Sequence, residues 1–284
     1  MKKVYSIIAL VLVFACIFSL AACGGKTQPS GDTSAQPSGD TSGTTSPAEI
    51  SVAFSILPNG LDPVSEDTNT TMSVCYHIYD KLVEIDNDYN FIPGVAKSWK
   101  EVDALTWTFE IDLSYKFQNG DPLTMDDIVY SFERLNDIPK SADTAKLIDS
   151  VTYEGSTLTI KAKEPNTTTI PRAFYTAPIV NKAYIEAGGD DAIYLKPVGT
   201  GPYKVTEFTP GTSVTIETWD GYPFAKPQIS KINFTAIPEN AARYIAVESG
   251  QLQYAGLVSG MELKLAEQAS DLSVLKGSST RYVG

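Results

Sequence analysis

The chain has 284 residues, with 22 Lys and Arg against 34 Asp and Glu, so its formal net charge at neutral pH is −12. This acidic balance argues against nucleic acid as a partner, because affinity for nucleic acid depends on contacts between basic side chains and phosphates. It also leaves no basic patch for anionic lipid. With three cysteines and one histidine, a metal site built from these ligands is excluded, and we expect no metal and no cofactor.

The first segment is typical of an exported lipoprotein. Lys2 and Lys3 precede an apolar run over residues 4–22 that ends at Leu20-Ala21-Ala22-Cys23. This ending resembles a bacterial lipobox, which implies cleavage before Cys23 and attachment of lipid to its sulfur. We therefore expect a signal peptide over residues 1–22. Two alternatives stay open: a retained transmembrane helix, for which the run is long enough, and an ordinary secretory signal.

Residues 23–47 form the next unit, which is of low complexity. The run Gln28-Pro29-Ser30-Gly31-Asp32-Thr33-Ser34 recurs as Gln36-Pro37-Ser38-Gly39-Asp40-Thr41-Ser42. Such a segment lacks the large apolar side chains that would offset its ordering entropy. We expect a disordered tether that joins the membrane to a folded domain over residues 48–284.

The folded part opens with a strand and a helix. Ile50, Val52, Phe54 and Ile56 alternate with smaller or polar residues and predict a strand over residues 50–56. A turn at residues 58–60 follows. Apolar spacing then predicts a helix over residues 70–80.

Short strands and helices continue to the end of the chain. We expect antiparallel strands at 99–102 and 106–113, hairpins at 151–162 and 203–218, a strand at 232–237 and a helix at 241–249. Thr124-Met125-Asp126-Asp127 is typical of a capping box that starts a helix. This pattern predicts a mixed α/β chain (α+β).

No set of residues in the sequence points to catalysis. The adjacent acids Asp126 and Asp127 are explained by helix capping, and we expect no catalytic residue and no enzyme. Glu84, Asp86 and Asp88 indicate a solvated turn, because the glycine and terminal glutamate of a calcium loop are missing. His77 is interpreted as a packing or surface residue, with a ligand contact as the alternative.

Ordered motifs mark the region between residues 93 and 135. They are Pro93-Gly94-Val95-Ala96-Lys97-Ser98-Trp99, Leu105-Thr106-Trp107-Thr108-Phe109-Glu110-Ile111, Lys116-Phe117, Asn119-Gly120 and Asp127-Ile128-Val129-Tyr130-Ser131-Phe132-Glu133-Arg134. This block resembles family 5 extracellular solute-binding proteins, the oligopeptide, dipeptide and nickel binders of ATP-binding cassette importers. Further matches extend it over most of the folded part: Leu61-Asp62-Pro63, Tyr79-Asp80-Lys81-Leu82, Gly199-Thr200-Gly201-Pro202-Tyr203 and Glu248-Ser249-Gly250. One departure is Gln118, where the family usually has histidine or a similar residue.

The resemblance implies a class II periplasmic-binding-protein-like fold with two lobes around a cleft. We expect this chain to hold the first lobe and to lack the second. Its main subdomain would comprise residues of about 48–80 and 195–284, and its inserted subdomain residues of about 81–194. The implied partners are an oligopeptide or other small solute and the permease and ATPase subunits of an importer.

The resemblance also implies which residues border a ligand. The extended segment Ser55-Ile56-Leu57-Pro58-Asn59 and the helical Tyr130 match positions that face the cleft in peptide-binding relatives, and His77 is added as a possible contact. A turn without a ligand role and a rim or core tyrosine remain alternatives. We expect a monomer, anchored by lipid at the extracytoplasmic face of the membrane, that captures peptides. Alternative functions are sensing or adhesion without transport, and a secreted hydrolase.

Overall fold

The computed structural model describes residues 48–65, 68–86, 88, 90–137, 141–165 and 169–276. The signal peptide, Cys23 and the tether expected over residues 1–47 lie outside these ranges. Within them, every helix is too short or too polar to cross a bilayer.

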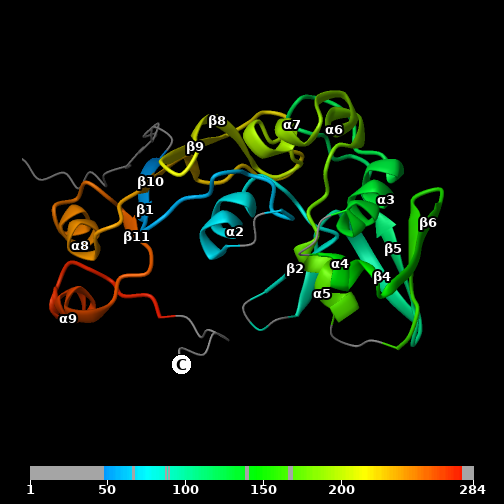
Figure 1. Ribbon diagram of the computed structural model, residues 1–284, viewed down its shortest axis with the longest axis horizontal. Coiled ribbons are helices and arrows are strands. Elements are labelled where there is room, and N and C mark those ends of the chain that lie inside the picture. The colour runs from blue at the N-terminus through cyan, green and yellow to red at the C-terminus, as the bar shows by residue number, and fades with distance from the viewer. Residues whose placement is uncertain are drawn as a thin grey trace, which may run out of the picture. The chain divides into compact units, whose positions relative to one another are not determined.

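A five-stranded sheet holds the start of the described chain (Figure 1). Its strand order is β11 (Tyr254–Ala255), β1 (Ala48–Phe54), β10 (Ile229–Ala236), β9 (Ser213–Thr218) and β8 (Tyr203–Thr209). Strand β1 pairs in parallel with both of its neighbours, whereas β10, β9 and β8 are antiparallel. The two predicted strands of the 203–218 hairpin are confirmed.

Strand β1 begins and ends two residues earlier than the predicted strand over residues 50–56. Val52 and Phe54 pack into the core on one face, and Ala53 packs against Ala246 of α8 on the other, so consecutive residues are buried. Such burial on both faces is typical of a parallel, internal strand. The strand ends at Phe54, whose carbonyl accepts the N–H of Ile237. The prediction that Ile56 continues the buried face is wrong, since 59% of Ile56 is exposed.

A separate four-stranded antiparallel sheet follows. Its order is β4 (Ala96–Asp103), β5 (Thr106–Ile111), β7 (Thr157–Ala162) and β6 (Ile148–Glu154), and a small hairpin of β2 (Val83–Ile85) and β3 (Phe91–Pro93) precedes it. In β5, Trp107, Phe109 and Ile111 are buried while Thr108 and Glu110 face outward. This alternation confirms the predicted strand.

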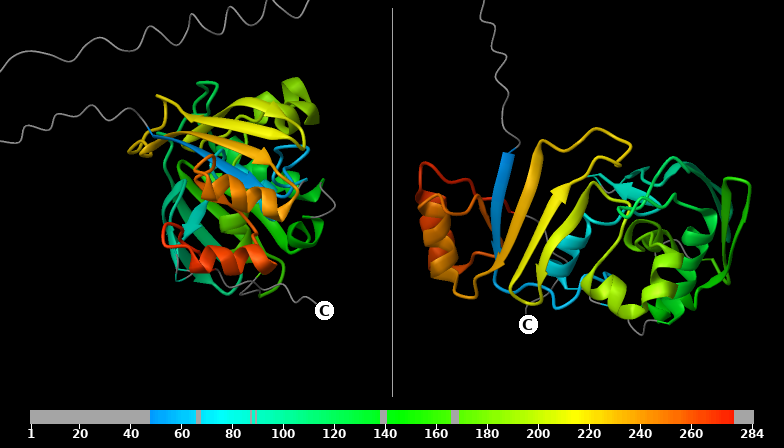
Figure 2. Two further views of the ribbon diagram at one scale, coloured as in Figure 1. Left: turned by 90° about the vertical axis from the view of Figure 1, so that its left-hand side faces the viewer. Right: turned by 90° about the horizontal axis from the view of Figure 1, so that it is seen from above.

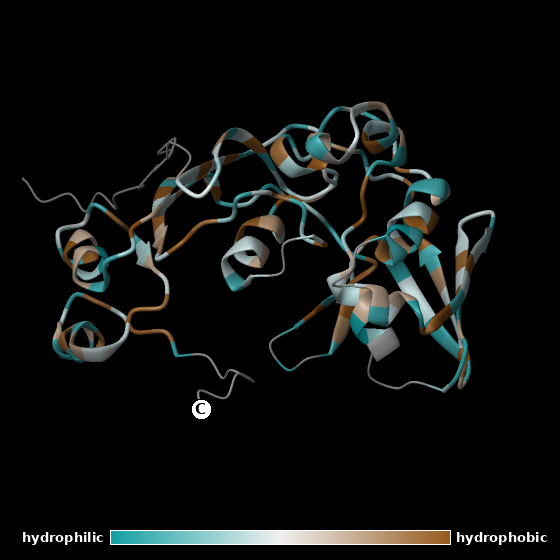
Figure 3. Cartoon of the chain, viewed as in Figure 1, coloured by the Kyte–Doolittle hydropathy of each residue, from teal (hydrophilic) through white to brown (hydrophobic). Residues whose placement is uncertain are grey.

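Helices cover the sheets (Figure 2). They are α2 (Asn69–Cys75), α3 (Met125–Glu133), the 3-10 turn η1 (Arg134–Asn136), α4 (Ala142–Ala145), α5 (Thr169–Thr176), α6 (Lys182–Gly188), α7 (Asp190–Leu195), α8 (Asn240–Glu248) and α9 (Gly260–Gln268). The capping box at α3 is confirmed: Thr124 Oγ1 accepts the N–H of Asp127, and Asp127 Oδ2 accepts the N–H of Thr124. Helices α8 and α9 mix polar and apolar residues (Figure 3), and they leave Ile245 and Met261 exposed.

The helix predicted over residues 70–80 ends early. Helix α2 starts after its cap Thr68 and stops at Cys75. Beyond it, the carbonyls of His77 and Ile78 accept the N–H groups of Tyr203 and Gly201, at 3.1 and 2.9 Å. These contacts with a distant segment replace the helical hydrogen bonds, so the prediction that the helix reaches residue 80 is wrong.

Beside the small cluster of Ala53, Ala246 and Leu252, the described chain has two larger hydrophobic cores. One lies between the four-stranded sheet and helices α3 and α5, and the other packs α2, α6 and α7 against the five-stranded sheet. The chain passes between them at Asp80 and returns at Ile179, whose N–H donates to the carbonyl of Asp80 at 3.0 Å. The subdomain boundaries expected from the sequence remain our interpretation.

The side chain of Gln118 joins the backbone segments at this crossing by hydrogen bonds. Its Nε2 donates to the carbonyls of Ile78 and Tyr203 at 2.9 and 2.7 Å, and its Oε1 accepts the N–H of Gly199 at 3.0 Å. A single amide therefore satisfies backbone groups from two distant segments. Gln118, where the sequence departs from the pattern that it resembles, thus joins segments that are far apart in the chain.

Candidate functional site

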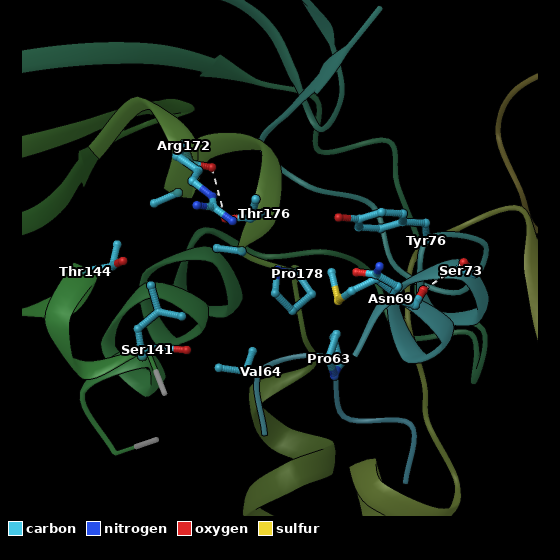
Figure 4. A pocket seen from close by; sticks show the side chains of 14 residues that line it. Pro63, Val64, Asn69, Ser73, Tyr76, Ser141, Thr144, Arg172, Thr176 and Pro178 are labelled. Atoms are coloured by element: carbon cyan, nitrogen blue, oxygen red, sulfur yellow. Dashed lines mark hydrogen bonds between the residues drawn. The ribbon is translucent and has the colours of Figure 1, made fainter. Parts of the chain in front are cut away.

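A cavity of about 750 Å³ lies beside α2, α4 and α5 (Figure 4). This volume falls within the range of small-molecule sites. Its lining residues come from five separate stretches of the chain: Pro63, Val64, Asn69, Met72, Ser73, Tyr76, Leu135, Ser141, Thr144, Arg172, Ala173, Thr176, Ala177 and Pro178.

Helix α2 supplies one wall. Asn69, Met72, Ser73 and Tyr76 are spaced by three and four residues, which places them on one face of a helix. The opposite face carries Val74, which is fully buried in the core. The cavity wall is therefore fixed by the packing of the helix behind it.

Helix α5 supplies the facing wall, on which Arg172 lies across the cavity from Tyr76 and Asn69 (Figure 4). Arg172 is the only charged side chain among the described lining residues. It is exposed and forms no ion pair with any residue that the structure describes. A guanidinium presents a planar fork of donors that fits a carboxylate. The cavity thus offers a positive group that no acidic residue of the described chain pairs with.

A second cation nearby is already neutralised. Lys81 Nζ lies 2.7 Å from Glu84 Oε2 and 4.5 Å from the centre of the Tyr76 ring. Burial, and then the Glu84 carboxylate, raise the pKa of the Tyr76 phenol. The phenol therefore stays protonated at neutral pH and remains a hydrogen-bond donor at the cavity.

The segment predicted to border a ligand does not line this cavity. Leu57 is 5% exposed and belongs to a hydrophobic core, and Pro58 is buried with its carbonyl accepting the N–H of Gly211. Ser55 is half-buried, whereas Ile56 and Asn59 are exposed. A contact of this segment with a ligand stays a prediction.

Tyr130 and His77 do not line the cavity either. Tyr130 is partly buried against the core of the five-stranded sheet, with Lys182 Nζ 5.9 Å from its ring centre. His77 packs edge-on against Tyr203, at 5.5 Å between ring centres, and burial followed by the charge of Lys81 lowers its pKa. His77 is therefore a neutral ring in an aromatic cluster, and ligand roles for both residues stay predictions.

Sequence reasoning missed Arg172 because it predicted no helix at α5. A signal was present: from residue 167 to residue 180, Arg172 is the only charged residue in a stretch of threonine, aromatic and aliphatic side chains. A lone cation in such a stretch indicates a position with a specific partner.

The match to a known family comes from the larger part of the chain. The model for bacterial extracellular solute-binding proteins, family 5 middle, matches residues 90–284. The chain belongs to this family. Because it is a family of binding proteins, the expectation that the chain is not an enzyme is confirmed.

The matches to individual relatives cover only about half of each relative's length. The dipeptide-binding protein of Escherichia coli (strain K12) is 24% identical over 248 residues, which are 77% of this chain and 46% of that protein. The oligopeptide-binding protein OppA of Bacillus subtilis (strain 168) is 28% identical over 290 residues, 92% of this chain and 51% of that protein. The chain thus spans about half the length of the curated relatives that it matches.

Solved structures confirm the expected mixed α/β periplasmic-binding-protein fold. The oligopeptide-binding protein AppA of Bacillus subtilis, solved with a nonapeptide, superposes with a TM-score of 0.70 at 21% identity, over 78% of this chain and 46% of that one. The nickel ABC transporter protein from Bacillus halodurans gives 0.67 at 27% identity, over 79% and 46%. The likeness to AppA shows the fold alone.

Proposed function

We propose that this chain forms one wall of the ligand site of an extracytoplasmic solute-binding protein that serves an ABC importer. The ligand is a peptide or another small solute with a free carboxylate, and Arg172 receives that carboxylate. The protein is anchored by lipid on Cys23 and delivers its solute to the permease and ATPase subunits. Family membership supports the class of function, and the cavity supports the choice of ligand group.

The observation that carries this proposal is the guanidinium of Arg172 in the cavity, which forms no ion pair with the residues that the structure describes. Hydrogen bonds to charged groups contribute about 1.5–3 kcal/mol each, more than neutral ones. Around Arg172 the lining offers hydroxyl and amide groups, from Ser141, Thr144, Thr176 and Asn69. These groups suit the peptide bond and carboxylate of a short peptide, because they both donate and accept hydrogen bonds.

The test compares a free carboxylate with a neutral amide. The dipeptide Met-Leu and its C-terminal amide are titrated into the isotope-labelled protein, and NMR follows the backbone peaks of α2 and α5 and the Arg172 Nε–H peak. NMR is chosen because it also measures weak binding. We expect the free acid to bind about tenfold more tightly than the amide, a difference of about 1.4 kcal/mol.

Two variants complete the test. Arg172→Gln removes the charge and is expected to abolish the preference for the free acid. Lys161→Gln, which removes an exposed charge on the outer face of β7, is the matched control and is expected to keep the preference. Equal affinity for acid and amide, or an unchanged preference in Arg172→Gln, would refute the assignment of Arg172.

A further inference from the structure

Asp62 and Arg134 form a buried ion pair close to the cavity. Arg134 Nη1 donates to Asp62 Oδ1 at 3.1 Å, and Nη2 donates to Oδ2 at 2.7 Å, so the two groups meet fork to fork. The Arg134 side chain is only 7% exposed, and the Asp62 side chain 4%. Among the ion pairs formed by described residues, no other has both side chains below a tenth exposed.

The pair joins two stretches that line the cavity. Pro63 and Val64 follow Asp62 directly, and Leu135 follows Arg134. Asp62 Oδ1 also accepts the N–H of Val64 at 3.2 Å, and the carbonyl of Asp62 accepts the Ser65 hydroxyl at 3.3 Å. The carboxylate therefore fixes the loop that carries one wall, while the guanidinium extends from the end of α3.

The pair also spans the two cores. Leu61, next to Asp62, is buried in the core of the five-stranded sheet, whereas Val64 and Leu135 belong to the core of the four-stranded sheet. The loop between Leu61 and Val64 thus changes from one core to the other within three residues. Arg134 holds it at that point.

Stability alone does not explain a buried pair of this kind. Removing two charges from water is costly, and apolar residues of similar volume often stabilise a protein equally well. Apolar contacts, however, do not fix the orientation of the two groups that meet. A guanidinium and a carboxylate meet in one planar, bidentate geometry, which sets the distance and orientation of the chains that carry them.

We infer that Asp62 and Arg134 are positioning residues for the cavity, holding its Pro63, Val64 and Leu135 walls at the separation that the solute requires. The inference rests on the proposed function of that cavity. Under this inference, solute affinity depends on two residues that act together. They are Asp62 in Leu61-Asp62-Pro63 and Arg134 at the end of the α3 motif.

The test replaces the pair by apolar residues. The double variant Asp62→Leu/Arg134→Met keeps the volume but loses both the fork and the acceptor for the Val64 N–H. Met-Leu is titrated by NMR as above. Because the titration follows peaks of folded molecules, a loss of stability does not itself weaken the measured affinity. We expect affinity to fall about tenfold and hydrogen exchange at the Val64 amide to accelerate.

Two further variants complete the test, one as an alternative to the double variant and one as a control. Arg134→Lys retains the charge without the fork, and it is the variant to measure if the double variant does not fold. Asp220→Asn/Lys226→Gln removes an exposed ion pair outside the cavity lining and is expected to bind Met-Leu like the parent. For Arg134→Lys we expect several-fold weaker binding.

The two possible failures differ. Parental affinity in both the double variant and Arg134→Lys overturns the positioning inference alone. No binding of Met-Leu by the parent protein refutes the proposed function, and the inference with it.

Discussion

Replacing Asp80 by asparagine should stabilise this protein at neutral pH. Asp80 is almost wholly buried at the crossing between the two cores, and its Oδ2 has no hydrogen-bond partner among the described residues. Burial raises its pKa from 3.8 to about 6; a hydrogen bond from Thr200 opposes the rise, Glu84 adds to it and Lys81 opposes it. Asparagine has the same shape and carries no charge.

The size of the effect follows from the two pKa values of Asp80. Because the folded pKa lies above the unfolded one, the folded protein binds the proton more tightly, and stability is lost as the pH rises from about 4 through about 6. Above that pH range, the whole of this loss of stability is present. A difference of about two pKa units corresponds to about 3 kcal/mol. Asp80→Asn should recover most of this at about pH 7.5 and almost none at about pH 4.

Urea unfolding of parent and variant at both pH values measures this difference. For a chain of this size, about 3 kcal/mol also predicts a rise of roughly 6–12 °C in the melting temperature. Asp62→Asn is the matched control, because Asp62 is equally buried but paired with Arg134, and breaking a buried pair destabilises. A variant Asp80→Asn that is less stable than the parent at about pH 7.5 would show that the carboxylate has a partner, and would refute the reasoning.

Three further outcomes are expected. Trp107→Ala should cost about 3–5 kcal/mol, because Trp107 is 6% exposed and its ring centre lies 5.7 Å from that of Phe174; an unchanged urea midpoint would contradict this packing. Thr124→Ala should cost about 1 kcal/mol through loss of the α3 cap, whereas Thr108→Ala, on the outer face of β5, should cost less; equal costs would exclude a capping effect. Cys23→Ala should abolish lipidation, which detergent partitioning measures; equal membrane retention would mean that the apolar run itself is the anchor.

Local sequence determined the elements whose signals lie within a few residues. The capping box of Thr124 and Asp127 started α3 where expected, because both hydrogen bonds join residues three apart. The alternation of Trp107, Phe109 and Ile111 gave the buried face of β5, because one face of an antiparallel sheet packs on a core while the other meets water. The ordered motifs over residues 93–135 identified the family for the same reason, since each motif can be recognised within its own short stretch.

Only the tertiary structure decided the features that depend on distant partners. Strand β1 ends at Phe54 because its neighbour β10, which comes much later in the chain, ends its pairing there. Helix α2 stops because residues near Gly201 take over its hydrogen bonds.

The candidate site belongs to this second group. Arg172 lies opposite Tyr76, and Arg134 is paired with Asp62, through packing between segments far apart in sequence. Residue type indicates what a side chain can bind, but the partner is set by which distant segment the folded cores bring beside it. For that reason the family could be read from this sequence, whereas the cavity and its buried ion pair could not.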